Sequence, residues 1–183
     1  MAPPSRPVLG NIREAFARVR SLDGVVVTTG VQAVDGASSD ASGLNLATIA
    51  ARQHFGFDGE SEGPIGPKRT IHRFYGNPAR PWLTRALEVN RQKWSAFAGR
   101  VVRAQARAEG PGLTVDGERA LRQLGVRMAA DAKLSITDGD WTPNSKRTIA
   151  LKGSSRPLID TGRLLQSQRA AVIVPGQAPE VIG

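Results

Sequence analysis

The residue types that most often carry out chemistry are few in this chain, and their spacing does not suit catalysis or metal binding. The two histidines, His54 and His72, lack the His-x-x-x-His spacing that places two zinc ligands on one helical face. Asp138 and Asp140 flank Gly139 as at the start of a calcium loop, but the ligands that must follow at fixed intervals are missing, which favours a plain turn. Neither a glycine-rich phosphate loop nor a nucleophile elbow is apparent. From these residues we expect no enzymatic activity, no bound cofactor and no metal ion.

The charge of the chain points to an acidic partner. Lysine and arginine number 25 against 16 acidic residues, which gives a net charge of +9. Nucleic acid is the first candidate partner for such a chain. The low aromatic content, 5%, and the lack of a zinc-finger, RNA-recognition or basic-zipper pattern argue against sequence-specific binding. A surface that meets packaged DNA electrostatically, or that docks on an acidic neighbour, needs no such motif.

Cysteine content and hydrophobicity narrow the class of protein further. The chain has no cysteine, which excludes a disulfide framework and any cysteine-based zinc site. No run approaches the ~20 apolar residues of a membrane span, and residues 1–7 lack the apolar core of a signal peptide. We therefore expect no membrane association. A length of 183 residues suits one domain with a core of its own.

The first half of the chain contains signals for two helices and two strands. Asn11 and Glu14 have the spacing of a capping box, and the apolar residues that follow recur on one face, which predicts a helix from Asn11. A run of β-branched residues, 25–29, predicts a buried strand. A short helix is expected from Asn45, and the alternation over 68–75 predicts a second strand. A helix followed by a strand is typical of an α+β layer.

Three segments lack any apolar periodicity. Residues 36–43 combine glycine, alanine, serine and aspartate and are predicted to be a mobile loop. Residues 57–67 are a second mobile loop, either a flexible arm or the solvated tip of a hairpin. Residues 175–183 are a tail that is free in the monomer. We expect all three to become ordered only against partners, because their composition buries too little apolar surface to offset the entropy of ordering.

A long helix is predicted from Pro81 to about residue 109, because apolar residues recur there at intervals of mostly three and four. At 100° per residue, five cations fall within an arc of about 80° beside the apolar face. This basic stripe is either a solvated face or a surface that meets a DNA channel or an acidic subunit edge. The apolar face consists of Leu83, Leu87, Trp94, Phe97 and Val101, with Asn90 in one position, and the basic stripe consists of Arg85, Lys93, Arg100, Arg103 and Arg107.

A second long helix is predicted over 116–134, after a Gly-Pro-Gly turn at 110–112. The short connection implies an antiparallel helical pair, in which Gly125 and Ala132 let the two backbones approach closely. A last strand, 169–174, is expected to complete the sheet that the first strand begins. These elements predict a single α+β domain over 1–174, in which a small antiparallel or mixed sheet packs against the long antiparallel helical pair.

Two brief helices are predicted in the C-terminal third. Pro143 after Thr142 is a helix start signal, because proline fits the first helical position and threonine can cap it, and Gly153 supplies the stop. Asp160 is a second start signal, since its carboxylate can accept the free amides of a short turn over 161–165 and thereby fix the Arg156-Pro157 loop.

These C-terminal residues also resemble the signature of a known family. The pattern comprises Trp141-Thr142-Pro143-Asn144-Ser145, Thr148-Ile149, Lys152-Gly153-Ser154 and Pro157-Leu158-Ile159-Asp160-Thr161-Gly162-Arg163-Leu164. It is similar to that of the phage virion-morphogenesis or tail-completion proteins, which form the neck between the head and tail of a tailed phage. Earlier in the chain, Pro78-Ala79-Arg80-Pro81-Trp82-Leu83 resembles the family's junction into its main helix. His54-Phe55-Gly56 resembles a His-Glu-Phe-Gly turn of the family, with the acidic residue absent.

The resemblance implies a structural subunit of the virion and not an enzyme. The subunit would be assembled in the bacterial cytoplasm as a six-fold homo-oligomeric ring that completes the tail and contacts the head connector or stopper and the tail tube proteins. The alternative is a basic nucleic-acid-binding domain without catalysis. Under the family interpretation, the residues expected at assembly interfaces are Arg80, Pro81, Trp82, Arg156, Pro157, Asp160, Thr161 and Gly162.

Overall fold

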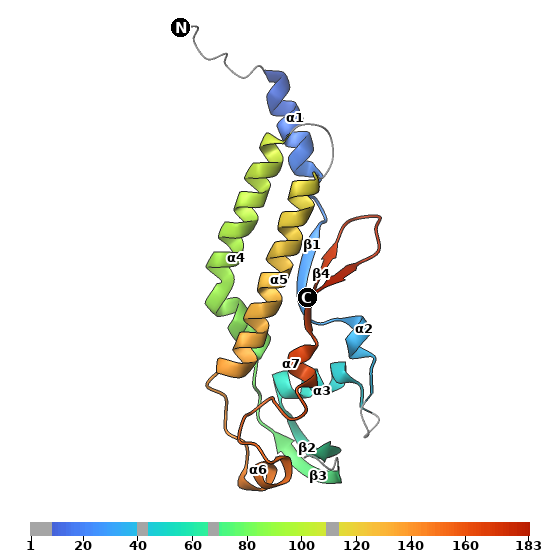
Figure 1. Cartoon of the computed structure of the whole chain (residues 1–183), viewed down its shortest axis with the longest axis vertical. Helices are drawn as coiled ribbons and strands as arrows, with labels where there is room; N and C mark the ends of the chain where they lie inside the picture. The colour runs from blue at the N-terminus through green and yellow to red at the C-terminus, as the bar shows by residue number, and fades with distance from the viewer. Residues whose placement is uncertain (1–8, 40–43, 66–69, 109–113) are drawn as a thin grey trace.

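The computed structural model describes residues 9–39, 44–65, 70–108 and 114–183 of the chain. Two long helices, α4 (Trp82–Arg107) and α5 (Val115–Asp138), pack side by side in antiparallel directions (Figure 1). A three-stranded sheet packs against α5, and a separate two-stranded hairpin lies beyond the end of the helical pair at which α4 begins. The predicted α+β fold with a small sheet on a long antiparallel helical pair is confirmed.

The buried face of α4 matches the predicted apolar face at Asn90, Trp94 and Val101 and differs from it elsewhere. Leu87 is 49% exposed, because the helix turns Ala86 toward the core in its place. Leu83 and Phe97 are half-buried at the margins of the face. Apolar intervals of three and four define the direction of such a face only approximately, so a predicted member such as Leu87 can lie outside it. The buried residues of α4 are Trp82, Ala86, Asn90, Trp94, Val101 and Gln105.

Small residues on α5 contact two different neighbours. Ala132 is fully buried with Trp94 in the cluster between α4 and α5, as predicted. Gly125 instead faces the sheet, where a Cβ atom would lie 2.9 Å from Ile182 Cδ1 and 3.0 Å from Ala170 Cβ. The expectation that Gly125 lies between the two helices is therefore wrong, and its lack of a side chain brings α5 close to the strands.

The sheet joins the two ends of the chain. Its strands are β1 (Val26–Val31), β4 (Gln168–Ile173) and β5 (Glu180–Ile182), in the order β1-β4-β5 with antiparallel pairing. Strand β4 completes the sheet that β1 begins, as predicted. Strand β1 is a half-exposed edge and not the buried strand expected from its composition, with Val26 47% exposed. The segment 175–183 is not a free tail, because β5 within it pairs with β4.

The predicted loop over 57–67 is mostly a strand. Strand β2 (Phe57–Ile65) pairs antiparallel with β3 (Thr70–Asn77), so the loop prediction is corrected, and only 66–67 lie outside the described residues. The glycine, glutamate and proline of this segment have low strand propensity, so the strand was not predicted from local sequence. Pairing with β3 defines it instead. In the other predicted loop, Ser39 forms a bridge with Asn45, and residues 40–43 lie outside the described part.

Helix ends follow local hydrogen bonding. Helix α1 (Leu9–Arg20) begins before Asn11, so Asn11 is not its cap. Helix α2 (Ala33–Gly36) is a single turn. Helix α3 (Leu46–Phe55) is capped by Asn45, whose Oδ1 accepts a hydrogen bond from the backbone of Thr48, as its position in the sequence indicates. The turn predicted at 110–112 lies outside the described residues.

The two brief C-terminal helices begin later than predicted. Helix α6 (Lys146–Lys152) is capped by Ser145 and not by Thr142, because Ser145 Oγ accepts from the amide of Thr148. Gly153 ends it in the left-handed conformation at φ 74°, as predicted. Helix α7 (Arg163–Gln166) begins after Gly162, its N-cap residue, two residues beyond the predicted start at Asp160.

Candidate assembly site at the base of the β2–β3 hairpin

Arg80 is a buried cation at the point where β3 leads into α4. Only 3% of its surface is exposed. Its Nε donates to the carbonyl of Thr142 at 3.0 Å, and Nη1 donates to Asn77 Oδ1 at 3.0 Å. Longer hydrogen bonds of 3.4 Å reach Gln53 Oε1 and Asn144 Oδ1. Arg80 thus joins the end of α3, the base of the hairpin and the connection between α5 and α6.

The charge of Arg80 is stabilised by neutral oxygens, since every hydrogen-bond acceptor named above is a carbonyl or an amide. Burial lowers the pKa of Arg80 from its ordinary value. Arginine still remains protonated at neutral pH, and its guanidinium is more weakly hydrated than an ammonium, which suits it to burial. Its fork of N–H donors can serve several acceptors at fixed angles, which a lysine cannot do.

Asn144 extends this network into the loop after α6. Its Nδ2 donates to the carbonyls of Ser155 and Arg156 at 3.3 and 3.2 Å. Lys152 Nζ also donates to the Arg156 carbonyl. Burial lowers the pKa of Lys152, while the charge of Asp160 opposes this shift and that of Arg80 adds to it. The backbone of the loop is therefore held from within.

Trp82 is the apolar counterpart of Arg80. It is 1% exposed and packs in a cluster with Ile136 and Leu164. Its Nε1 donates to Gln168 Oε1 at 3.2 Å, and its carbonyl accepts from Ser135 Oγ at 2.8 Å. These contacts tie the first turn of α4 to the end of α5 and to the start of β4.

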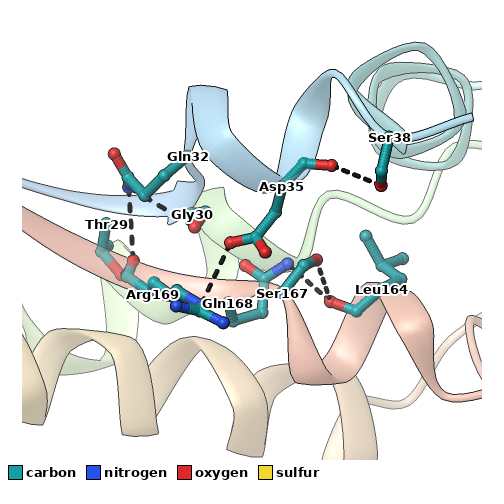
Figure 2. Close-up of polar contacts among 9 residues, drawn as sticks. All are labelled: Thr29, Gly30, Gln32, Asp35, Ser38, Leu164, Ser167, Gln168 and Arg169. Atoms are coloured by element: carbon teal, nitrogen blue, oxygen red, sulfur yellow. Dashed lines mark hydrogen bonds and ion pairs between the residues drawn. The ribbon is translucent and has the colours of Figure 1, made fainter. Parts of the chain in front are cut away.

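The start of β4 is itself braced by polar contacts, which Figure 2 shows. Gln168 Nε2 donates to the carbonyl of Leu164 at 2.9 Å, so both ends of this buried amide are occupied. Arg169 Nε lies 3.0 Å from Asp35 Oδ2, a charge contact without hydrogen-bond alignment. Gln32 Nε2 donates to the Arg169 carbonyl at 3.4 Å. Helix α2 is therefore attached to β4.

Leu158 has an unusual backbone conformation in the same region. At φ 59° it is the one non-glycine residue with positive φ among those that the structure describes. Such a conformation costs roughly 1–2 kcal/mol for a residue with a Cβ. The Leu158 side chain packs against the cluster around Trp82, and this burial offsets the strain. The turn before α7 is thus held by packing.

The residues predicted to form assembly interfaces fall into three groups by burial. Arg80 and Trp82 are buried, so in this conformation they support the interior of the subunit and present no surface to a neighbour. Pro81, Pro157 and Gly162 are half-buried, whereas Arg156, Asp160 and Thr161 are exposed. The segments around Arg80 and after Trp141, which are far apart in the chain, meet through the hydrogen bonds of Arg80.

Sequence reasoning missed the polar partners of these residues. Gln53, Asn77, Ser135 and Gln168 each accept or donate in the networks above. Asn77 stands directly before Pro78, where the chain must leave the strand, and this position is a usable signal for a turn-stabilising amide. Gln168 carries no comparable signal, because its partner Trp82 is 86 residues away.

Metal-ligating side chains are not clustered in the part of the chain that the structure describes. Within those ranges, no group of three or more histidine, cysteine, aspartate or glutamate side chains could hold a metal ion. The run Gly59-Glu60-Ser61-Glu62-Gly63 has the letters of a nucleophile motif, but it lies inside β2 and not at the strand-to-helix turn that an elbow requires.

None of the helices that the structure describes is long and apolar enough to cross a membrane. Comparison of the chain with protein-family models, with curated proteins and with solved structures gives no match.

The burial of His54 predicts that the stability of this region depends on pH. Its Nε2 lies 3.3 Å from Thr84 Oγ1, its Nδ1 is buried without a hydrogen-bond partner, and its ring packs edge-on against Trp82 at 4.9 Å. Burial lowers the pKa of His54 in the folded state. The unfolded chain therefore takes up the proton first. Stability should be complete above the ordinary histidine pKa of about 6.5 and should fall as pH drops below it, by at most about 1.4 kcal/mol per pH unit.

Urea unfolding between pH 8 and pH 5 measures this effect. In His54→Gln, which cannot take up a proton, the decline between pH 7 and pH 5 should be shallower than in the wild-type chain. Equal slopes in the two proteins would show that His54 does not contribute to the pH dependence.

Proposed function

We propose that this chain is a structural subunit of the neck of a tailed bacteriophage, forming a homo-oligomeric ring that completes the tail and joins it to the head connector. The motifs that resemble the tail-completion proteins support the class of protein. The protruding hairpin supports assembly as its mode of action. The second argument is independent of the first.

The β2–β3 hairpin is the observation that carries this proposal. Its two strands pair with each other, and beyond slight contacts no other described helix or strand packs along them. An isolated two-stranded hairpin is marginally stable in water at best. Both of its edges also offer unpaired backbone groups to another chain. A hairpin of this kind is suited to an arm that gains its stability against a neighbouring subunit.

The base of this arm is firmly anchored. Asn77 Nδ2 donates to the carbonyl of Arg52 at 3.3 Å, and Asn77 Oδ1 accepts from Arg80. A Cβ atom on Gly56 would lie 2.7 Å from the amide nitrogen of Ala79, so the two ends of the hairpin approach as closely as glycine allows. The arm therefore leaves the subunit in a direction set by buried contacts, as repeated identical contacts in a ring require.

The three-stranded sheet offers further contact surface. Strands β1 and β5 are its edges, and each leaves one side of its backbone unpaired within the described sheet. An arm from one subunit that meets such an edge on the next is a heterologous contact, and this type of contact closes into a ring when the rotation between subunits permits. The ring interpretation thus needs no interface beyond these elements.

Native mass spectrometry and light scattering of the purified chain test the proposal. The wild-type chain should form a closed oligomer of one copy number. In a matched variant, a short Gly-Ser link joins Phe57 directly to Asn77, which are cross-strand partners at the hairpin base. This variant should keep the helical circular dichroism signal and the melting temperature of the wild-type chain but remain monomeric. A wild-type chain that stays monomeric at every concentration, or a shortened chain that assembles normally, would contradict the proposal.

A further inference from the structure

Helix α4 carries far more positive charge than its partner α5. Six cations and a single carboxylate, Glu88, occur along α4. Helix α5 carries four cations and four carboxylates and is therefore balanced. The net charge of the chain is thus concentrated on one long helix, and the cations of the basic stripe lie along one side of it.

Two of the four cations of α5 are paired with carboxylates, whereas among the described residues none of the basic stripe is. Arg119 contacts Asp116 at 3.4 Å, and Arg122 contacts Glu118 and Glu180 at 2.8 and 2.7 Å. Within the described part of the chain, no carboxylate forms an ion pair with Arg85, Lys93, Arg100, Arg103 or Arg107.

Like charges are also close neighbours on α4. Arg100 and Arg103 are three residues apart, and Arg103 and Arg107 are four apart, so each pair lies on adjacent turns of the same side. Like-charge pairs at this spacing destabilise a helix. A solvated face can avoid this repulsion by placing carboxylates among the cations, as α5 does. The unrelieved repulsion on α4 favours an external anion as the missing partner.

One aromatic ring gathers cations from both helices. The guanidinium of Arg100 lies 5.0 Å from the centroid of Phe97, and that of Arg127, from α5, lies 5.7 Å from the same centroid. Stacking on the ring positions both groups without neutralising either of them. Among the described residues, Arg127 also has no ion-pair partner. The basic stripe therefore extends across the helical pair at this point.

We infer that the basic stripe and Arg127 form a binding surface for the phosphate backbone of duplex DNA, without sequence preference. From Arg85 to Arg107 the stripe covers about 33 Å at a rise of 1.5 Å per residue, which is close to one turn of a DNA duplex. Lys93, Arg100 and Arg107 recur every seven residues, about 10 Å apart, along a rigid support. An acidic peptide is a poorer fit, because peptide grooves offer apolar pockets for anchoring side chains, whereas here the Phe97 ring is occupied by two guanidinium groups. The inference does not depend on the proposed ring of subunits, since DNA binding can be measured whatever the oligomeric state of the chain.

Fluorescence anisotropy with a labelled duplex of about 30 base pairs, roughly three turns, tests this surface between about 50 and 200 mM salt. The wild-type chain should bind with an affinity that falls steeply with salt. In Arg100→Gln/Arg127→Gln, the slope of log affinity against log salt should become shallower by about 2, since each phosphate contact contributes about 0.9. Affinity at about 100 mM salt should fall roughly ten- to a hundredfold.

The matched control is Arg119→Gln/Arg122→Gln, which removes the same charge from the paired positions of α5. It should bind DNA within a few-fold of the wild-type chain. Circular dichroism should show both variants folded, because glutamine is close to arginine in helix propensity. Equal weakening in the two variants would show that net charge alone attracts DNA. Lack of wild-type binding at the lowest salt, or tight binding of polyglutamate in place of DNA, would also overturn the inference.

Discussion

Trp82→Ala should cost about 3–5 kcal/mol of stability, the largest single effect that we expect in this chain. Trp82 is almost wholly buried in a cluster with Ile136 and Leu164, and truncation leaves a cavity between the first turn of α4 and the end of α5. It also leaves Gln168 Oε1 without its donor. For a chain of this size, the melting temperature should fall by about 6–20 °C. Urea and thermal unfolding followed by circular dichroism measure the loss.

Trp82→Phe separates packing from hydrogen bonding. Phenylalanine keeps most of the apolar contact but lacks the Nε1–H that Gln168 accepts. We expect an intermediate loss of about 1–3 kcal/mol, because a buried acceptor left unpaired costs about that much. A fall no larger than 0.5 kcal/mol in Trp82→Ala, the usual range for exposed sites, would show that Trp82 is not part of the core.

Local signals predicted the elements that depend on local physics. Asn45 caps α3 because its side chain needs only the amide of Thr48, three residues on. Gly153 ends α6 because glycine reaches the left-handed conformation without strain. Pro81 precedes α4 for a similar reason, since its fixed φ suits the start of a helix. In each case the determining interaction lies within a few residues of the signal.

Elements that depend on distant partners were not predicted. Residues 57–65 form a strand because 70–77 pair with them, and residues 180–182 do so because β4 lies beside them. The start of α6 was placed too early because Thr142 and Ser145 are both capable of capping a helix. Asn144 decides between them, since it must stay outside the helix to reach the carbonyls of Ser155 and Arg156.

The role of Arg80 could not be read from the sequence for the same reason. An arginine is ordinarily exposed. Its burial here is possible because it donates hydrogen bonds to Gln53 and Thr142, which are 27 and 62 residues away in the chain. The motif residues around Arg80 and Asn144 therefore form the internal support of the hairpin. Under the proposed ring, surface contact with neighbours would be left to the hairpin itself, the sheet edges and the exposed residues of the loop before α7. This division predicts that a change at Arg80 should affect the arm and the fold together.

Arg80→Lys should destabilise the chain by about 2–4 kcal/mol although it preserves the charge. A lysine has one nitrogen at the end of its side chain and cannot reach Thr142 and Asn77 at the same time with the geometry of a guanidinium fork. At least one buried acceptor then loses its partner, at about 1–3 kcal/mol each, and the ammonium is harder to desolvate. Urea unfolding measures the loss. Relative to the wild-type chain, hydrogen exchange should speed up more at the amides of the hairpin base than at those in the middle of α4.

The matched control is Arg103→Lys, the same substitution at an exposed position of α4. It should change stability by no more than about 0.5 kcal/mol, because exposed side chains away from special contacts contribute little. The difference in stability between the two variants measures the contribution of the buried guanidinium hydrogen bonds, apart from any general effect of replacing arginine by lysine. If Arg80→Lys proved as stable as Arg103→Lys, with no change in exchange at the hairpin base, the hydrogen bonds of Arg80 would not be what anchors the arm to the helical pair.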